Sequence, residues 1–235
     1  YYDVFTFLEH AVGWSHAKAK EFINELLNCE FETKWQKERK EDISQYLDYI
    51  GSPQFEKRFP ILFKELVTAN AYGIFQHLLL EARRKIYDHL VTQTENPVFF
   101  LGIREFQRKL LNSGIERGVS ISALQRKLKF ITKLGLLEVV PDTSLPVEFV
   151  TYSHQKRYKK GYRYRVNYYS VPEFSLKLFA DAEDIIHEMK ELNIRRRYYS
   201  RQTELWANGK EEADKQYVQD QDIGKSKKTI AFYQR

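Results

Sequence analysis

The sequence predicts a mainly α-helical protein with a small β-hairpin. Apolar residues recur at steps of three and four through much of the chain, which is the pattern of amphipathic helices. One segment in the second half alternates between aromatic and basic residues, as a half-exposed strand does. Hydrophobic residues make up 43% of the 235 residues, which argues against a disordered chain and allows a sizeable core.

The most informative stretch runs from Gly118 to Val140. Ser120 fits a helix N-cap, and Gly135 fits the left-handed residue that follows a helix. Residues 136–140 then have the composition of a strand. Between the two caps, the apolar positions have helical spacing: Ile121, Leu124, Leu128, Ile131 and Leu134.

The opposite side of this predicted helix is polar and basic. Its residues lie on one face by their spacing: Ser122, Gln125, Arg126, Lys129 and Lys133.

The flanking segments predict further elements. Residues 99–111 predict a short strand and a second helix, and residues 112–118 a turn into the Ser120 helix. Residues 162–171 predict a strand with Tyr162, Tyr164, Val166 and Tyr168 on one face and Arg163, Arg165 and Asn167 on the other. A basic loop is expected before it, with these residues at its tip: Lys156, Arg157, Lys159 and Lys160.

Two packed helices followed by two strands and a basic loop resemble a winged-helix DNA-binding domain. The resemblance covers residues 97–172, and its most telling part is SISALQRKLKFITKLGLLEVV. As a helix-turn-helix variant, such a domain would place the Ser120 helix in the major groove. The fold class expected is therefore a winged helix-turn-helix preceded by a helical N-terminal domain.

This resemblance implies a set of DNA contacts. Arg126 can bond a guanine edge with two hydrogen bonds, Gln125 an adenine edge, and Ser122 or Lys129 a base or a phosphate. The basic loop would reach phosphates or a minor groove, and Tyr158 could stack on an unpaired base. The candidate DNA-binding residues are Ser122, Gln125, Arg126, Lys129, Lys133, Lys156, Arg157, Tyr158, Lys159, Lys160, Arg163 and Arg165. The alternative is an ordinary solvated helix face, with the strand tyrosines packed against the helices.

The distribution of charge favours a polyanionic partner. Residues 102–171 contain fourteen Lys and Arg against five Asp and Glu, a net charge of +9. Residues 1–101 contain twelve against fifteen, and residues 172–235 balance at twelve each. The positive charge therefore lies on the segment that resembles a DNA-binding domain.

The N-terminal 29 residues predict two helices joined at Gly13, with Ser15 as the second N-cap. The order Asp3-Val4, Phe7, Gly13 and Ala19 resembles the segment that follows the zinc ribbon of bacterial and phage DNA primases. The family's metal ligands would lie before Tyr1, so the resemblance assigns no ligand here. A plain helical hairpin explains the same residues.

The remaining segments of the chain predict further helices. A solvated helix is expected in 30–52, a helix that begins or kinks at Pro60 in 55–66, one long apolar helix in 68–91, and a further helix in 172–193. These divide the chain into a helical N-terminal domain (1–67), a connecting helix (68–96), a winged-helix domain (97–172) and a C-terminal helix with a polar tail (173–235).

No motif predicts a catalytic centre, a metal site or a cofactor. The six histidines form no HExxH pair, and Cys29 is the single cysteine. Asp181, Glu183 and Asp184 form an acidic cluster that either binds magnesium or complements a helix N-terminus. No run is long and apolar enough to span a bilayer, so a soluble cytoplasmic protein is expected. Because the sequence starts without a methionine and its single methionine is Met189, the chain is expected to be an excerpt of a longer polypeptide.

The function expected is DNA binding in the replication of a phage, plasmid or mobile element, as an initiator or the DNA-engaging part of a primase-like protein. The partners expected are double-stranded DNA, single-stranded or forked DNA, and other replication proteins, without a membrane. The main alternative is a transcriptional repressor that binds its operator as a dimer. An enzyme, and a winged helix that binds protein, are further alternatives.

Overall fold

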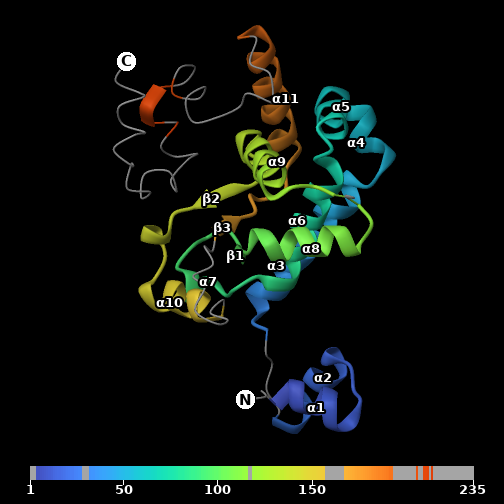
Figure 1. Ribbon diagram of the computed structural model, residues 1–235, viewed down its shortest axis with the longest axis vertical. Helices are drawn as coiled ribbons and strands as arrows, with labels where there is room; N and C mark the ends of the chain where they lie inside the picture. Colours follow the sequence, from blue (N-terminus) through green and yellow to red (C-terminus); the bar gives the residue numbers. More distant parts are fainter. Residues whose placement is uncertain are drawn as a thin grey trace. The chain divides into compact units, whose positions relative to one another are not determined.

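The computed structural model describes residues 4–27, 32–115, 118–156 and 167–192, with single positions at 205, 209–211 and 213. It divides into two compact units, Tyr1–Glu38 and Arg39–Arg235. Figure 1 shows both, with a mainly helical second unit around a small antiparallel sheet. This confirms the predicted mixture of many helices and few strands. Among the described helices, none is long and apolar enough to cross a membrane.

The first unit contains a helical hairpin, as the sequence predicts. α1 (Val4–Val12) and α2 (His16–Leu27) are joined by a turn in which Gly13 has a φ of +72°. Ser15 caps α2, since its hydroxyl accepts a hydrogen bond from the amide of Lys18 at 3.3 Å. Trp14 packs edge-on against Phe22, with 5.0 Å between ring centroids. The Ser15 cap and the Trp14–Phe22 contact both stabilise the hairpin.

α3 (Lys34–Ile50) begins in the last residues of the first unit and continues into the second. The larger helical part of the second unit also contains α4 (Pro53–Arg58), α5 (Pro60–Thr68), α6 (Tyr72–Lys85), α7 (His89–Thr92) and α11 (Leu176–Glu191). α3 begins with a capping box, in which Thr33 and Gln36 each accept a hydrogen bond from the other's backbone amide. Aromatic side chains from these helices and from residues beside them meet around Phe179, which is fully buried. The rings in contact with Phe179 are Tyr46, Tyr49, Phe55, Phe59 and Phe174.

One residue of the expected acidic cluster on α11, Glu183, has a role that neither interpretation of the sequence predicted. α11 starts at Leu176, so the three carboxylates lie beyond its first turn and do not complement its own N-terminus. Instead, the Glu183 carboxylate accepts hydrogen bonds from the amides of Ile61 and Leu62, both at 2.9 Å. These amides belong to the first turn of α5, where backbone donors have no intrahelical partner. Glu183 therefore caps α5 from a distant part of the chain.

The single long helix predicted over residues 68–91 is wrong. The chain leaves the helical conformation at Ile86 and starts a new helix at His89, where the Asp88 carboxylate accepts from the Leu90 amide at 2.8 Å. The break turns Tyr87 onto the sheet, and its ring stacks on Phe100 with 5.5 Å between centroids. Packing against the sheet decides the break, because the apolar periodicity continues through it.

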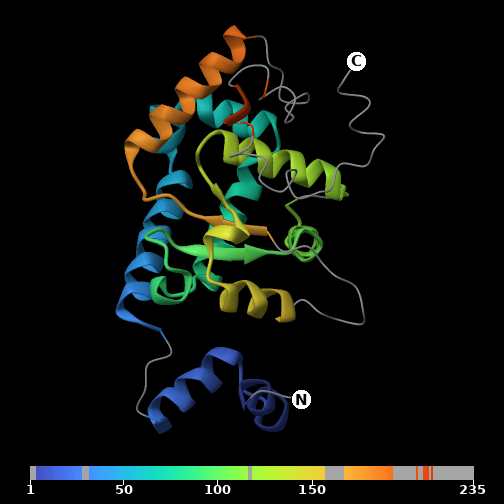
Figure 2. The same cartoon turned by 90° about the vertical axis from the view of Figure 1, so that its left-hand side faces the viewer.

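The sheet contains β1 (Val98–Leu101), β2 (Glu138–Val140) and β3 (Asn167–Ser170) in the order β1-β3-β2, with both pairs antiparallel. Between β1 and β2 lie α8 (Ile103–Asn112) and α9 (Ile121–Lys133). A 3-10 turn (Asp142–Ser144) and α10 (Val147–Lys156) follow β2. In Figures 1 and 2, α7 and α10 lie on one side of the sheet, and α9 and α11 on the other.

The sequence did not predict α10, and this changes one predicted site residue. Lys156, expected at the tip of a loop, is the last residue of α10. The helix forms because Phe149 packs under the sheet, against Tyr87, Phe100 and Tyr168. Residues 162–166 of the expected strand lie outside the described residues, and β3 is Asn167–Ser170.

Candidate nucleic-acid interface

The helix α9 is held at both ends as its sequence predicts. The Ser120 hydroxyl accepts from the Ala123 amide at 3.2 Å. At the other end Gly135 has a φ of +70°, and its amide donates to the Thr132 carbonyl at 3.0 Å. Leu124, Leu128 and Ile131 are buried, as expected, together with Leu134. These contacts fix which side of α9 is turned to solvent.

The opposite face of α9 contains the predicted contact residues. Ser122, Gln125 and Arg126 are exposed, while Lys129 and Lys133 are half-buried. The whole helix, ISALQRKLKFITK, contains no acidic residue. This face combines donors and acceptors of the kinds that bind base edges with lysines suited to phosphates.

Replacing Ser120 by Ala should lower the free energy of unfolding by about 1 kcal/mol. The substitution removes the acceptor for the Ala123 amide at the exposed end of α9. Urea unfolding of the two proteins measures the difference, and Ser120→Asn, which keeps a side-chain acceptor, is the matched control. Equal stability of wild type and Ser120→Ala would show that the cap contributes nothing.

The structure does not show where most of the predicted wing residues lie relative to α9. Six of them lie outside the described residues: Arg157, Tyr158, Lys159, Lys160, Arg163 and Arg165. Lys156 is described through its backbone only, as the last residue of α10. The candidate interface that the structure describes is therefore the α8–α9 part.

Two arginines on α8 were not among the predicted contacts. Arg104 and Arg108 are both exposed and lie one helical turn apart. Their i, i+4 spacing was the available signal, because it places both on one face of the helix that precedes α9. They add positive charge to the helix that precedes α9.

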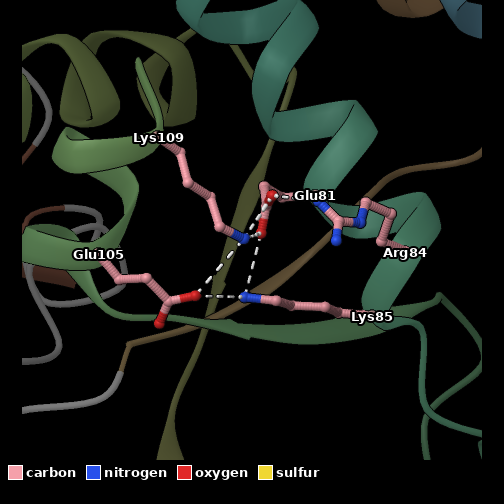
Figure 3. Close-up of polar contacts among 5 residues, drawn as sticks. All are labelled: Glu81, Arg84, Lys85, Glu105 and Lys109. Carbon is pink, nitrogen blue, oxygen red and sulfur yellow. Dashed lines mark hydrogen bonds and ion pairs between the residues drawn. The ribbon is translucent and has the colours of Figure 1, made fainter. Parts of the chain in front are cut away.

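An ion cluster around the buried carboxylate of Glu81 joins α8 to α6 (Figure 3). Both carboxylate oxygens of Glu81 accept from the Lys109 ammonium, at 2.7 and 2.6 Å, and Lys85 lies 3.0 Å from the same group. Glu105 lies 3.4 Å from each of the two lysines, and Arg84 lies 3.6 Å from Glu81. The Glu81 side chain is only 7% exposed, so α8 is locked to α6 through a carboxylate inside the protein.

The charge state of Glu81 follows from two opposed effects. Burial alone would raise the pKa of its carboxyl, but hydrogen bonds from Lys109 and Lys85 and their positive charges outweigh burial. The net result is a pKa below the ordinary value, so the carboxyl is ionised at neutral pH. Lys85 and Lys109 are therefore engaged in ion pairs within the protein.

Close approach also fixes the turn after α8. A Cβ on Gly73 of α6 would lie 2.9 Å from Cγ2 of Ile115, so glycine leaves room for this turn. On α8, the Gln107 side-chain amide donates to the Val119 carbonyl at 2.5 Å, just before the N-cap of α9. α6, α8 and the start of α9 are thus connected by direct contacts.

Other kinds of site find little support in the described part of the chain. No group of three or more His, Cys, Asp and Glu residues there could hold a metal ion. A small depression lies where α3 meets the ends of β1 and β3, and Arg39, Asp42 and Glu173 contribute its charges. Arg39 and Asp42 pair with each other at 3.1 Å. This mixed lining does not define an active centre.

Comparison with known proteins finds no match: no family model, no curated protein and no solved structure is similar to this chain at a significant level.

Proposed function

We propose that this protein binds double-stranded DNA, with α9 lying in the major groove. The observation that supports this most is the exposed, acid-free face of α9 on a helix that is capped at both ends. Rigid helices whose N-terminal residues face outward are the usual readers of base edges. The net charge of +9 over residues 102–171 supplies the attraction to phosphates.

The proposal includes a winged helix-turn-helix. Its support is the chain order β1, α8, α9, β2, β3 and the sheet order β1-β3-β2, in which the strands after α9 form an antiparallel pair. The insertion of α10 between β2 and β3 is a departure from a plain basic loop. The basic segment expected to contact phosphates or a minor groove has Lys156, Arg157, Lys159 and Lys160 at its tip, and of these only Lys156 is among the described residues.

Contacts in the proposed complex divide by chemistry. Arg126 bonds a guanine edge through two hydrogen bonds and Gln125 an adenine edge, while Lys129 and Lys133 neutralise phosphates. Arg104 and Arg108 of α8 lie on the helix that crosses the backbone in this geometry. Base contacts give sequence preference, and phosphate contacts give strength and register.

Replacing Arg126 by Ala should weaken binding to the preferred site by about 1–3 kcal/mol and relax the sequence requirement at one position. A preferred target sequence is first selected from a random duplex library with the wild-type chain. The affinities of both proteins for it are then measured by fluorescence anisotropy. Lys57→Ala, which removes an exposed positive charge from α4, is the control. A loss that is equal for all sequences would remove Arg126 from the base-reading set.

We propose replication of a phage, plasmid or mobile element as the process, with a transcriptional repressor as the alternative. The first rests on the resemblance of residues 1–29 to the segment that follows the primase zinc ribbon. The footprint separates the two roles: an initiator binds origin repeats or prefers forked DNA, whereas a dimeric repressor binds palindromic half-sites about 10 bp apart. Absence of DNA binding at low salt would exclude both.

A further inference from the structure

The Gln107 side chain connects α8 to the first residues of α9. Its Nε2 donates to the carbonyl oxygen of Val119 at 2.5 Å, across twelve positions of sequence. Val119 is 7% exposed and directly precedes Ser120, the N-cap of α9. The bond therefore lies between the middle of one helix and the start of the next.

The Val119 carbonyl needs such a partner. It lies before the N-cap, so it does not take part in the hydrogen-bond ladder of α9, and a buried carbonyl without a donor is costly. Once this oxygen is held, the position of Ser120 is held, and the first turn of α9 follows from the Ser120 cap. Ser122 lies in that turn, and Gln125 and Arg126 lie in the turn that follows it.

α8 itself is a firm base for this bond. Phe106 and Leu110 on α8 are buried, at 1% and 0% exposure, and Lys109 is bonded to Glu81 of α6. The Gln107 bond thus fixes the N-terminal end of α9 relative to α8, whose other face is packed in the core. Since two hydrogen bonds to one base require close alignment, a small shift of this end would misplace Arg126.

We propose that Gln107 is a positioning residue that sets the register of α9 for reading base edges. This inference rests on the proposed DNA binding and adds to it a residue that contacts the protein backbone instead of DNA. Its effect should fall on sequence preference, because attraction between lysines and phosphates tolerates a small shift whereas bidentate base contacts do not.

The test compares specific and non-specific binding of the full chain. Gln107→Leu, which keeps a similar volume without the donor, should lose about tenfold in affinity for the selected site. Its affinity for a mixed-sequence duplex of equal length should stay within about twofold of wild type, because the phosphate contacts are unchanged. Gln45→Leu, the same replacement at an exposed position of α3, is the control and should change neither affinity.

A second variant gives a signature that general loosening of the fold would not produce. In Gln107→Glu the ionised carboxylate opposes the Val119 carbonyl, whereas the protonated acid can donate the same hydrogen bond. Its preference for the selected site, measured relative to wild type at each pH, should therefore recover as pH falls from 7 to about 4, through the ordinary range of a glutamate pKa. Gln107→Leu should show no such recovery.

The outcomes separate this inference from the proposed function. Wild type that binds no duplex at low salt overturns both. Wild type that prefers its selected site, together with a Gln107→Leu variant that keeps this preference, overturns the inference alone. So does a variant in which specific and non-specific affinity fall alike, because that pattern indicates partial unfolding.

Discussion

Glu81→Gln should destabilise the protein by about 3 kcal/mol, the low end of the range for breaking a buried ion pair. The Glu81 side chain is 7% exposed, and the substitution leaves Lys85 and Lys109 beside a neutral amide. These lysines are 22% and 30% exposed, so water partly compensates them and limits the loss. Urea unfolding monitored by circular dichroism measures the change.

Glu105→Gln is the matched control for this substitution. Glu105 touches the same two lysines at 3.4 Å, but its side chain is 32% exposed, so its removal should cost under about 1 kcal/mol. If the two variants unfold alike, the buried position of Glu81 has no special importance. The double variant Glu81→Leu with Lys109→Met should recover part of the stability, because apolar side chains need no counter-ion.

The contribution of Glu81 should also depend on pH in a defined direction. Its pKa in the folded protein lies below its value in the unfolded chain, about 4.3. The stabilisation is therefore fully present above pH of about 5 and is lost as pH falls through the folded-state pKa. The difference in unfolding free energy between wild type and Glu81→Gln should shrink between about pH 5 and pH 3, and a constant difference would contradict this assignment.

Raising the salt concentration from about 50 to about 200 mM should weaken DNA binding by about 60- to 500-fold. The estimate assumes three to five neutralised phosphates, which gives a slope of log affinity against log salt of roughly −3 to −4.5. The basis is the acid-free α9 face together with the positive charge of residues 102–171. Anisotropy titrations with one duplex at several salt concentrations measure this slope.

Lysine substitutions test where this salt dependence originates. Lys129→Gln or Lys133→Gln should each reduce the magnitude of the slope by about 1 and weaken all sequences alike. The Lys57→Gln variant on α4 should leave the slope unchanged. A slope near zero for wild type would mean that binding does not depend on phosphate neutralisation, which would remove the electrostatic support for the proposed function.

The sequence alone determined the elements whose signals are local. The limits of α9 follow from Ser120 and Gly135, and its buried side follows from the spacing of its apolar residues. The hairpin of α1 and α2 followed from Gly13 and Ser15 in the same way. Caps and periodicity act within a few residues, so they can be recognised without knowledge of the fold. The exposed face of α9 was predicted for the same reason.

The tertiary structure decided everything that depends on contacts between distant residues. Glu81 meets Lys109 across 28 positions, Gln107 meets Val119 across 12, and Glu183 meets Leu62 across 121. The break at Ile86 and the helix α10 likewise follow from packing of Tyr87 and Phe149 against the sheet. A buried carboxylate or amide takes the partner that the fold brings to it, and local spacing does not contain that information.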